Sequence, residues 1–137
     1  MLPAPPAGSP KLFRPPWGHQ DPGTRLLARR LGYEVVAWNA MGEDWRLDPP
    51  EEVVARIETR LAPGAIVLLH DRLYKTDAQA HRDRSPTLEA VRLLLERQRG
   101  TRFVTVPELL RLGRPMRWHW YKRPDLDWLH RQIGEPA

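Results

Sequence analysis

Residues suited to acid–base chemistry and ligand contact come at or soon after the ends of three stretches of strand-like sequence. In chain order they are Arg14, Trp17, Asp44, Trp45 and His70, which follow the stretches 11–13, 34–38 and 65–69. In parallel α/β folds the carboxyl ends of the strands share one rim, where chemistry gathers. A histidine exchanges protons near neutral pH, and a neighbouring carboxylate keeps it protonated as an acid. Each residue alone is more often a salt bridge, a cap or a core residue, but together they favour a site.

The elements that would position these residues alternate along the chain. Strand-like stretches are expected at 11–13, 34–38, 65–69 and 101–106, and helices at 22–31, 50–61, 87–99 and 107–112. The near-continuous apolar stretches 34–38 and 65–69 are typical of strands buried on both faces. About four strand–helix alternations with short connections predict an α/β fold with a parallel sheet. This is roughly half of the units that a closed (β/α) barrel needs.

Apolar residues at helical spacing predict which helix faces are buried. The expected faces are Val53, Val54, Ile57 and Leu61 in the helix at 50–61, and Leu88, Val91, Leu94 and Leu95 in the helix at 87–99. The helix at 22–31 carries apolar residues at Leu26, Leu27 and Leu31. Asp48, before Pro49 and Pro50, is expected to cap the second helix.

Composition limits the classes of protein that the chain can belong to. It has 137 residues, enough for one ordinary domain, and no cysteine, which excludes disulfides and cysteine-ligated zinc. No apolar run approaches the roughly 20 residues of a membrane helix. Residues 1–6 lack the basic and apolar regions of a secretory signal, but the compartment stays open because Met1 need not be the natural start.

The net charge of +5 comes mostly from arginine and is scattered along the chain, which favours a solvated basic surface over a nucleic-acid site. One cluster between Arg114 and Arg123 interleaves Arg and Lys with Trp118, Trp120 and Tyr121. Such rings can stack on sugars or bases. Dense aromatic residues usually need cover, so a tail that packs on the domain is favoured.

Three of the strand-like stretches resemble motifs of the polysaccharide deacetylases, the NodB-homology domain. They are Leu12-Phe13-Arg14-Pro15-Pro16-Trp17-Gly18, then Val35-Val36-Ala37-Trp38 with Asp44-Trp45, and then Ile66-Val67-Leu68-Leu69-His70-Asp71. They are similar to the third, fourth and fifth motifs of that family, and the order and spacing of the remaining elements also match. The resemblance covers about residues 11–112. The expected organisation is therefore an irregular Pro-rich leader at 1–10, a partial NodB-homology domain at 11–113 and a basic aromatic tail at 114–137.

The resemblance implies a function and a role for each matching residue. The fold would be the carboxyl-terminal half of a deformed (β/α) barrel that removes acetyl groups from sugar polymers. A divalent metal, usually zinc, would activate water, and Arg14 would orient an aspartate base. His70 would protonate the departing amine, while Leu68 and Trp45 would line the pocket for the acetyl methyl group. Asp44 and Trp17 would also belong to the substrate-binding residues.

Two departures from the family pattern stand out. The opening motifs T-F-D-D and H-x-x-x-H, which carry the base and the metal ligands, are absent. The five histidines, at 19, 70, 81, 119 and 130, do not have that spacing, and Asp83 beside His81 is better explained as chance in a loop. In addition, Asn39 and Met41 stand where the fourth motif often carries an acid, so Asp44 or Asp71 would have to serve His70.

Three hypotheses follow. The leading one is a deacetylase chain that lacks its metal-binding half and acts on an acetylated polysaccharide once that half is supplied. The second is an inactive relative that binds glycans, which Asn39 and Met41 suggest. The third and least favoured is a nucleic-acid-binding module. Half a barrel would also leave open sheet edges, which invite pairing with the missing half or self-association.

Overall fold

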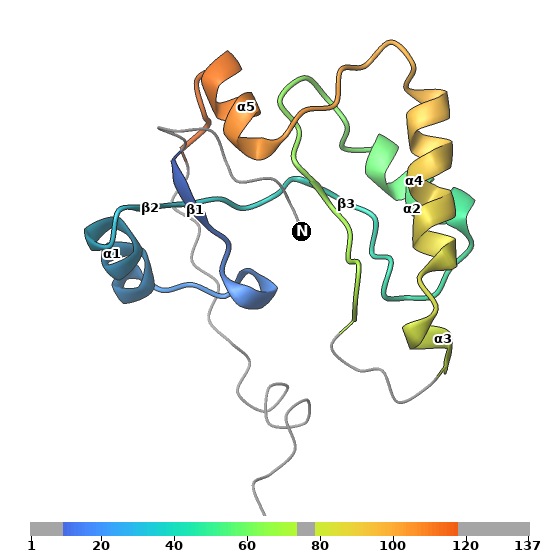
Figure 1. Cartoon of the computed structure of the whole chain (residues 1–137), viewed down its shortest axis with the longest axis horizontal. Coiled ribbons are helices and arrows are strands. Elements are labelled where there is room, and N and C mark those ends of the chain that lie inside the picture. Colours follow the sequence, from blue (N-terminus) through green and yellow to red (C-terminus); the bar gives the residue numbers. More distant parts are fainter. Residues whose placement is uncertain (1–9, 74–78, 118–137) are drawn as a thin grey trace, which may run out of the picture. The chain divides into compact units, whose positions relative to one another are not determined.

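The computed structural model describes residues 10–73 and 79–117, which fall into two compact units (Figure 1). The first unit holds the described residues up to Ala37 and those from Leu110 onward. The second runs from Trp38 to Leu109. The predicted leader and most of the predicted tail lie outside the described residues, so the division at 1–10, 11–113 and 114–137 stays a prediction.

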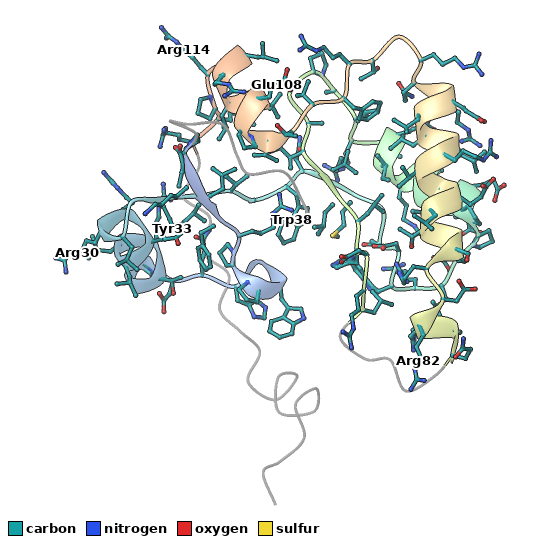
Figure 2. The ribbon with its side chains drawn as sticks, in the orientation of Figure 1. Arg30, Tyr33, Trp38, Arg82, Glu108 and Arg114 are labelled. Carbon is teal, nitrogen blue, oxygen red and sulfur yellow. The ribbon has the colours of Figure 1, made fainter. Side chains whose placement is uncertain are left out.

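The first unit is built around a parallel strand–helix–strand motif. Strand β1 (Lys11–Phe13) is followed by the short 3-10 helix η1 (Pro16–Gly18), helix α1 (Pro22–Arg30) and strand β2 (Tyr33–Val35). The strands pair in parallel register, with Lys11 opposite Tyr33, and the ladder continues where Val36 N donates to Phe13 O at 2.9 Å. Figure 2 shows Arg30 at the end of α1 and Tyr33 at the start of β2.

Helix α1 begins where the sequence dictates, because the Asp21 carboxylate accepts a hydrogen bond from Thr24 N at 2.6 Å. Its larger apolar residues are not its buried ones, however. Leu26, Leu27 and Leu31 are all more than half exposed, and Ala28 is the buried residue of the helix. The small Ala28 side chain faces inward, while the three leucines have no cover among the described residues.

The second unit repeats the motif. Strand β3 (Ala40–Met41), helix α2 (Pro50–Glu58) and strand β4 (Val67–Leu68) form a parallel pair with its crossover helix. Helices α3 (Gln79–Arg82) and α4 (Ser85–Arg97) follow, and α5 (Val106–Leu112) begins in this unit. The α/β class with parallel strands is therefore confirmed.

The core of this unit lies between α2, α4 and the strand pair. Val53, Val54 and Ile57 of α2 are buried, as the helical spacing predicts, and they pack with Ala40, Ala90 and Leu94. The predicted face of α4 is only partly right, because Leu88 is 70% exposed and Leu95 is also exposed. The residues Thr87, Ala90 and Leu94 form the buried stripe instead. Ala90 is completely buried, so a small residue lies where α4 approaches the core.

Two strand predictions need correction. The stretch 101–106 forms no strand: residues 101–105 are irregular, and α5 already begins at Val106. Val67 of β4, Phe103 and Val104 line a common hollow, and in the described sheets β4 has no ladder pairing with residues 101–106. The stretch 65–69 is half-buried rather than buried on both faces, because β4 has a paired neighbour only at β3 in the described part of the chain. The four-unit partial barrel stays a prediction.

Within the two described ranges, no helix has the length and apolar character needed to cross a membrane.

Gly42 follows β3 at a position where the backbone passes very close to the core. A Cβ atom there would lie 2.8 Å from both Leu69 Cδ2 and Val53 Cγ1. We expect Gly42→Ala to lower the free energy of unfolding by about 1–3 kcal/mol through overpacking. Urea denaturation measures this, with Gly100→Ala as the control because a Cβ at Gly100 meets nothing within 4 Å. Equal stabilities of the two variants would contradict the packing described for Gly42.

Candidate active site

The centre of the second unit's polar site is a buried carboxylate that holds a histidine. The Asp44 side chain is 1% exposed, whereas His70 is about one third exposed. Asp44 Oδ1 lies 2.9 Å from His70 Nδ1, and Asp44 Oδ2 accepts a hydrogen bond from His70 N, also at 2.9 Å. The carboxylate thus fixes both the backbone and the ring of the histidine. Of the two acids that the sequence offered to His70, Asp44 is the one in contact.

Arg84 and Thr87, at the start of α4, meet the other side of this carboxylate. Arg84 Nη2 donates to Asp44 Oδ2 at 2.5 Å and to Thr87 Oγ1 at 2.6 Å. The same nitrogen lies 3.3 Å from Asp44 O and 3.4 Å from His70 O. Thr87 Oγ1 in turn lies 3.4 Å from Asp44 Oδ2. Asp44 therefore joins the loop after β3, the residues after β4 and the first turn of α4.

The surroundings of Asp44 favour its ionised form. Burial alone raises the pKa of a carboxyl group. Against this, the hydrogen bonds from His70 and the positive charge of Arg84 lower it, and the net effect is an Asp44 pKa below the usual value. The carboxylate is thus charged across the neutral range and accepts hydrogen bonds only. This makes Nδ1 the protonated nitrogen of a neutral His70 ring and leaves Nε2 for proton transfer.

Trp45 packs directly on the histidine. The two ring centroids are 5.5 Å apart and the planes meet at 81°, an edge-to-face contact. Trp45 is still 39% exposed, so an apolar surface beside His70 remains open to solvent. Leu68 of β4 alternates with Val67 and Leu69, which pack against the core, so it belongs to the opposite face of the strand. The structure brings Trp45 and His70 together, and the acetyl pocket that Trp45 and Leu68 would line stays a prediction.

The loop between β3 and α2, which carries Asp44 and Trp45, has an unusual backbone held by an arginine. Glu43 and Leu47 have positive φ angles of 52° and 61°, a left-handed conformation that non-glycine residues rarely adopt. Arg56 of α2 donates to Gly42 O at 2.7 Å and pairs with Asp48. Asp48 is thus a partner of Arg56 and not the helix cap that the sequence predicts, since Pro49 precedes α2 without a side-chain cap.

Asn39 and Met41 occupy structural positions. Asn39 Oδ1 accepts a hydrogen bond from Ile66 N at 2.7 Å, and Asn39 N donates to Ile66 O at 3.2 Å. Asn39 therefore continues the β3–β4 ladder at the amino end of β4, whereas His70 follows its carboxyl end. Met41 is opposite Leu68 in the ladder. Since Asp44 already serves His70, an amide at position 39 does not deprive the histidine of its acid partner.

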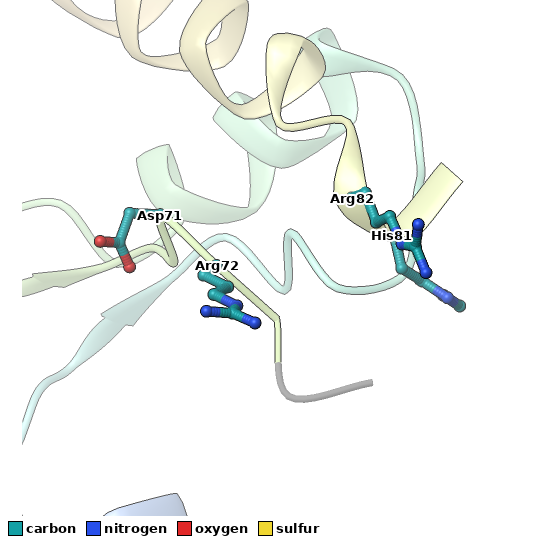
Figure 3. Close-up of a pocket in the computed structure, with 4 residues that line it drawn as sticks. All are labelled: Asp71, Arg72, His81 and Arg82. Carbon is teal, nitrogen blue, oxygen red and sulfur yellow. The ribbon is translucent and has the colours of Figure 1, made fainter. Parts of the chain in front are cut away.

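Asp71, the other acid considered for His70, lines a hollow of about 490 Å³ together with Arg72, His81 and Arg82 (Figure 3). Asp83 accepts a hydrogen bond from Ser85 N at 2.9 Å, which lowers the Asp83 pKa and gives this acid a capping role at the start of α4. No group of three potential ligands gathers anywhere in ranges 10–73 and 79–117.

Arg14 and Trp17 belong to the first unit. Arg14 Nε lies 3.3 Å from Val36 O and Nη2 lies 3.4 Å from Ala37 O, so this side chain joins the ends of β1 and β2. Partial burial lowers the Arg14 pKa from its usual value. Trp17 has a φ of 51°, is half exposed and lies near His19, with 6.4 Å between the ring centroids. The rim that Arg14 and Trp17 would share with His70 stays a prediction.

Two residues of the site escape sequence reasoning: Arg84, which contacts Asp44, and Arg56, which holds the loop. Both are arginines in a chain with 22 Lys and Arg residues, so their type carries no signal. The position of Arg84, directly before Ser85-Pro86 at the start of a helix, is the one hint, because an acid or a hydroxyl residue is usual there.

Comparison with known proteins places this geometry in a family. The chain is 37% identical over 106 residues to the peptidoglycan N-acetylglucosamine deacetylase of Bacillus cereus, a match that covers 74% of this chain and 46% of that protein. The chain belongs to the polysaccharide deacetylase family. It carries part of the family's domain, because the match spans 46% of the length of that relative.

Two solved structures of deacetylase-type proteins share the fold. A peptidoglycan N-acetylglucosamine deacetylase in complex with a hydroxamate inhibitor superposes with a TM-score of 0.61 at 22% identity, over 73% of this chain and 44% of that one. A pseudoenzyme of carbohydrate esterase family 4 from Bacillus anthracis gives a TM-score of 0.60 at 24% identity, over 73% of this chain and 32% of that one. No model of a known protein family matches this deacetylase-like chain.

The buried charge of Asp44 predicts how stability depends on pH. Its folded pKa is lower than its unfolded value of about 3.9, so its contribution is full above about pH 4 and is lost as the pH falls through the folded pKa. We expect Asp44→Asn to lower the free energy of unfolding by about 3 kcal/mol at pH 7, because Arg84 loses its partner. We also expect its stability to fall less steeply than that of the wild-type chain below pH 4.

Chemical denaturation between pH 2.5 and pH 7 measures both effects. Glu51→Gln is the matched control, because Glu51 is an exposed acid in the first turn of α2. Parallel pH curves for the wild-type chain and Asp44→Asn would contradict the depressed pKa of Asp44.

Proposed function

We propose that this chain supplies the proton-donor side of an active site that hydrolyses acetyl groups from a sugar polymer. The observation that carries the proposal is the His70 ring, held through Nδ1 by a buried carboxylate and packed on its edge by Trp45. The 37% identity to a peptidoglycan deacetylase supports the substrate class, an acetylated polysaccharide or oligosaccharide.

The proposed chemistry follows from the hydrogen bonds of the histidine. Hydrolysis of an acetamide adds water to the acetyl carbon and breaks the carbon–nitrogen bond, so the leaving nitrogen must take up a proton. Asp44 holds Nδ1–H of His70, so the ring presents Nε2 outward, and the protonated ring donates from Nε2 to that nitrogen. Acetate and a free amine are the products. Trp45 and Leu68 are proposed to border the acetyl methyl group, Arg14 to orient the aspartate base, and Trp17 to contact the substrate.

The described residues do not fit the divalent metal that the family resemblance implies. No cluster of three His, Asp or Glu side chains gathers in the part of the chain that the structure describes. We therefore propose that the metal ligands and the aspartate base come from polypeptide outside these residues. Among the described residues, each strand pair has unpaired outer edges and the leucines of α1 are exposed, which supports contact with such polypeptide.

The first experiment tests whether the metal ligands and the base come from other polypeptide while this chain supplies the acid. The 137-residue chain alone should release no acetate from an acetylated chito-oligosaccharide in the presence of zinc. Mixed with or fused to the amino-terminal half of the Bacillus cereus relative, which would supply the missing motifs, it should release acetate. In that assembly His70→Ala should lower the rate about 10²- to 10⁴-fold, because the leaving nitrogen loses its acid.

The matched control is His81→Ala, which removes a histidine that lies in the hollow with Asp71 and should leave the rate unchanged. Robust release by the chain alone would mean that the metal site lies within these 137 residues. Oligosaccharide binding without release by an assembly that holds zinc would favour the inactive glycan-binding relative instead.

The role of Trp45 is tested by the choice of acyl group. If its ring borders the acetyl methyl, Trp45→Ala in the active assembly should reduce the preference for acetyl over propionyl and butyryl groups. Pocket contacts of this size are worth about 1–3 kcal/mol, or about 5- to 150-fold in relative rate constants. Comparing kcat/KM for the three acylated substrates gives the answer, and an unchanged acyl profile would contradict the pocket.

A further inference from the structure

We propose that Arg84 is a positioning residue for the proton donor: its guanidinium fixes one oxygen of the Asp44 carboxylate so that the other faces His70 Nδ1. The inference rests on the proposed function of His70 as the acid. It concerns a side chain from a different element, the start of α4, that contacts no reacting atom and acts through Asp44.

The contacts divide the carboxylate between its two partners. Oδ2 receives Arg84 Nη2 at 2.5 Å and His70 N at 2.9 Å, while Oδ1 lies 2.9 Å from His70 Nδ1. The Arg84 nitrogen is itself fixed, because Thr87 Oγ1 accepts from it at 2.6 Å. A carboxylate held at Oδ2 from two directions cannot rotate, so Oδ1 keeps its direction toward the imidazole.

Arg84 occupies a position that is unfavourable for an arginine. It precedes α4 at the cap position, where the helix dipole favours negative charge, and its side chain is 12% exposed. In the described part of the chain, its buried Nε has no hydrogen-bond partner. A buried guanidinium and an unpaired donor both cost free energy that an apolar side chain would avoid. The ion pair with the Asp44 carboxylate offsets these costs.

Helix α4 does not need Arg84 for its own placement. Asp83 caps its first turn through Ser85 N, and Ala90 and Leu94 pack in the core with α2. Arg84 therefore acts mainly on the Asp44 carboxylate that contacts the histidine. Positioning of that kind differs from a general structural role, because it changes which histidine nitrogen carries the proton.

The decisive experiment reads the histidine itself in the intact 137-residue chain. Nitrogen-15 NMR distinguishes the two neutral tautomers of His70, and the Asp44 side-chain carbon reports protonation of the carboxyl. In the wild-type chain we expect one tautomer with hydrogen on Nδ1. In Arg84→Met we expect a mixture of both tautomers, and Asp44 should take up its proton at a higher pH than in the wild-type chain, since a neighbouring cation is lost. The charged or polar groups in contact with Asp44 are His70 after β4 and Arg84 and Thr87 from α4.

Arg92→Met is the matched control, because it removes an exposed arginine of the same helix that pairs only with Glu89 and Glu96 among the contacts described. A single Nδ1–H tautomer in Arg84→Met, with an Asp44 titration like that of Arg92→Met, would overturn the proposal. If Arg84→Met does not fold, Arg84→Lys decides. A lysine keeps the charge but not the fixed fork of donors, so mixed tautomers support the proposal and one pure tautomer overturns it.

A kinetic measurement extends the test to the active assembly. Arg84→Met should lower kcat about 10- to 100-fold with little change in KM, because a misdirected acid affects the reaction more than substrate binding. The two readouts fail separately. If the assembly releases no acetate, the proposed function fails while the tautomer result still stands. If His70 is the acid but Arg84→Met leaves both kcat and the tautomer unchanged, only the positioning role is lost.

Discussion

One buried carboxylate is the constraint on which the second unit's polar architecture depends. A charged group with 1% of its side chain exposed is tolerated only when hydrogen bonds and opposite charge replace the lost water. Asp44 obtains these from the backbone and ring of His70 and from Arg84. Its partners come from sequence positions 26 and 40 residues away, so the carboxylate can be buried only after β4 and α4 are in place. The site is thus a product of tertiary folding.

The loop that carries Asp44 is shaped by the same requirement. Glu43 and Leu47 adopt left-handed backbone conformations, each of which costs on the order of 1 kcal/mol. Arg56 holds the loop by Gly42 O and Asp48, and Gly42 lies tightly against Leu69. The strained turn places Asp44 inward and leaves Trp45 partly exposed at consecutive positions. Successive side chains of a regular strand would also point to opposite faces. They would, however, stay in line with β3 and would not reach the end of β4.

The sequence predicts the parts of this structure that depend on local order. Both parallel strand–helix–strand motifs and the α2 core residues Val53, Val54 and Ile57 follow from residue type and spacing. The rule that strand ends share a rim puts Asp44, Trp45 and His70 near one another, and the structure then selects Asp44 over Asp71 as the partner of His70 and packs the Trp45 ring on it.

The sequence does not predict those features for which several residues of the same type could serve equally well. Helix α4 has leucines on several faces, so the buried stripe through Ala90 is fixed by how closely α4 approaches the core and not by leucine spacing. The stretch 101–106 has strand-like composition, but a strand exists only with a hydrogen-bonded neighbour, and in the described sheets β4 has no ladder pairing with it. Asn39 looked like a lost catalytic acid, yet its amide oxygen closes a ladder position at Ile66. Arg84 could not be distinguished from other surface arginines without the fold.

The placement of the acid has a consequence for how a complete active site is assembled. Asp44, His70, Trp45 and Arg84 all lie between Trp38 and Leu109, within one compact unit, and among the described residues the contacts that orient the histidine are internal to it. The direction of Nε2 is therefore set before any residue from elsewhere joins the site. Under the proposed function, a metal ligand or a base supplied by other polypeptide would meet a histidine whose direction is already fixed, which costs less conformational entropy than ordering both sides at once. The orientation of the proposed acid can thus be tested through the tautomer of His70 without the rest of the active site.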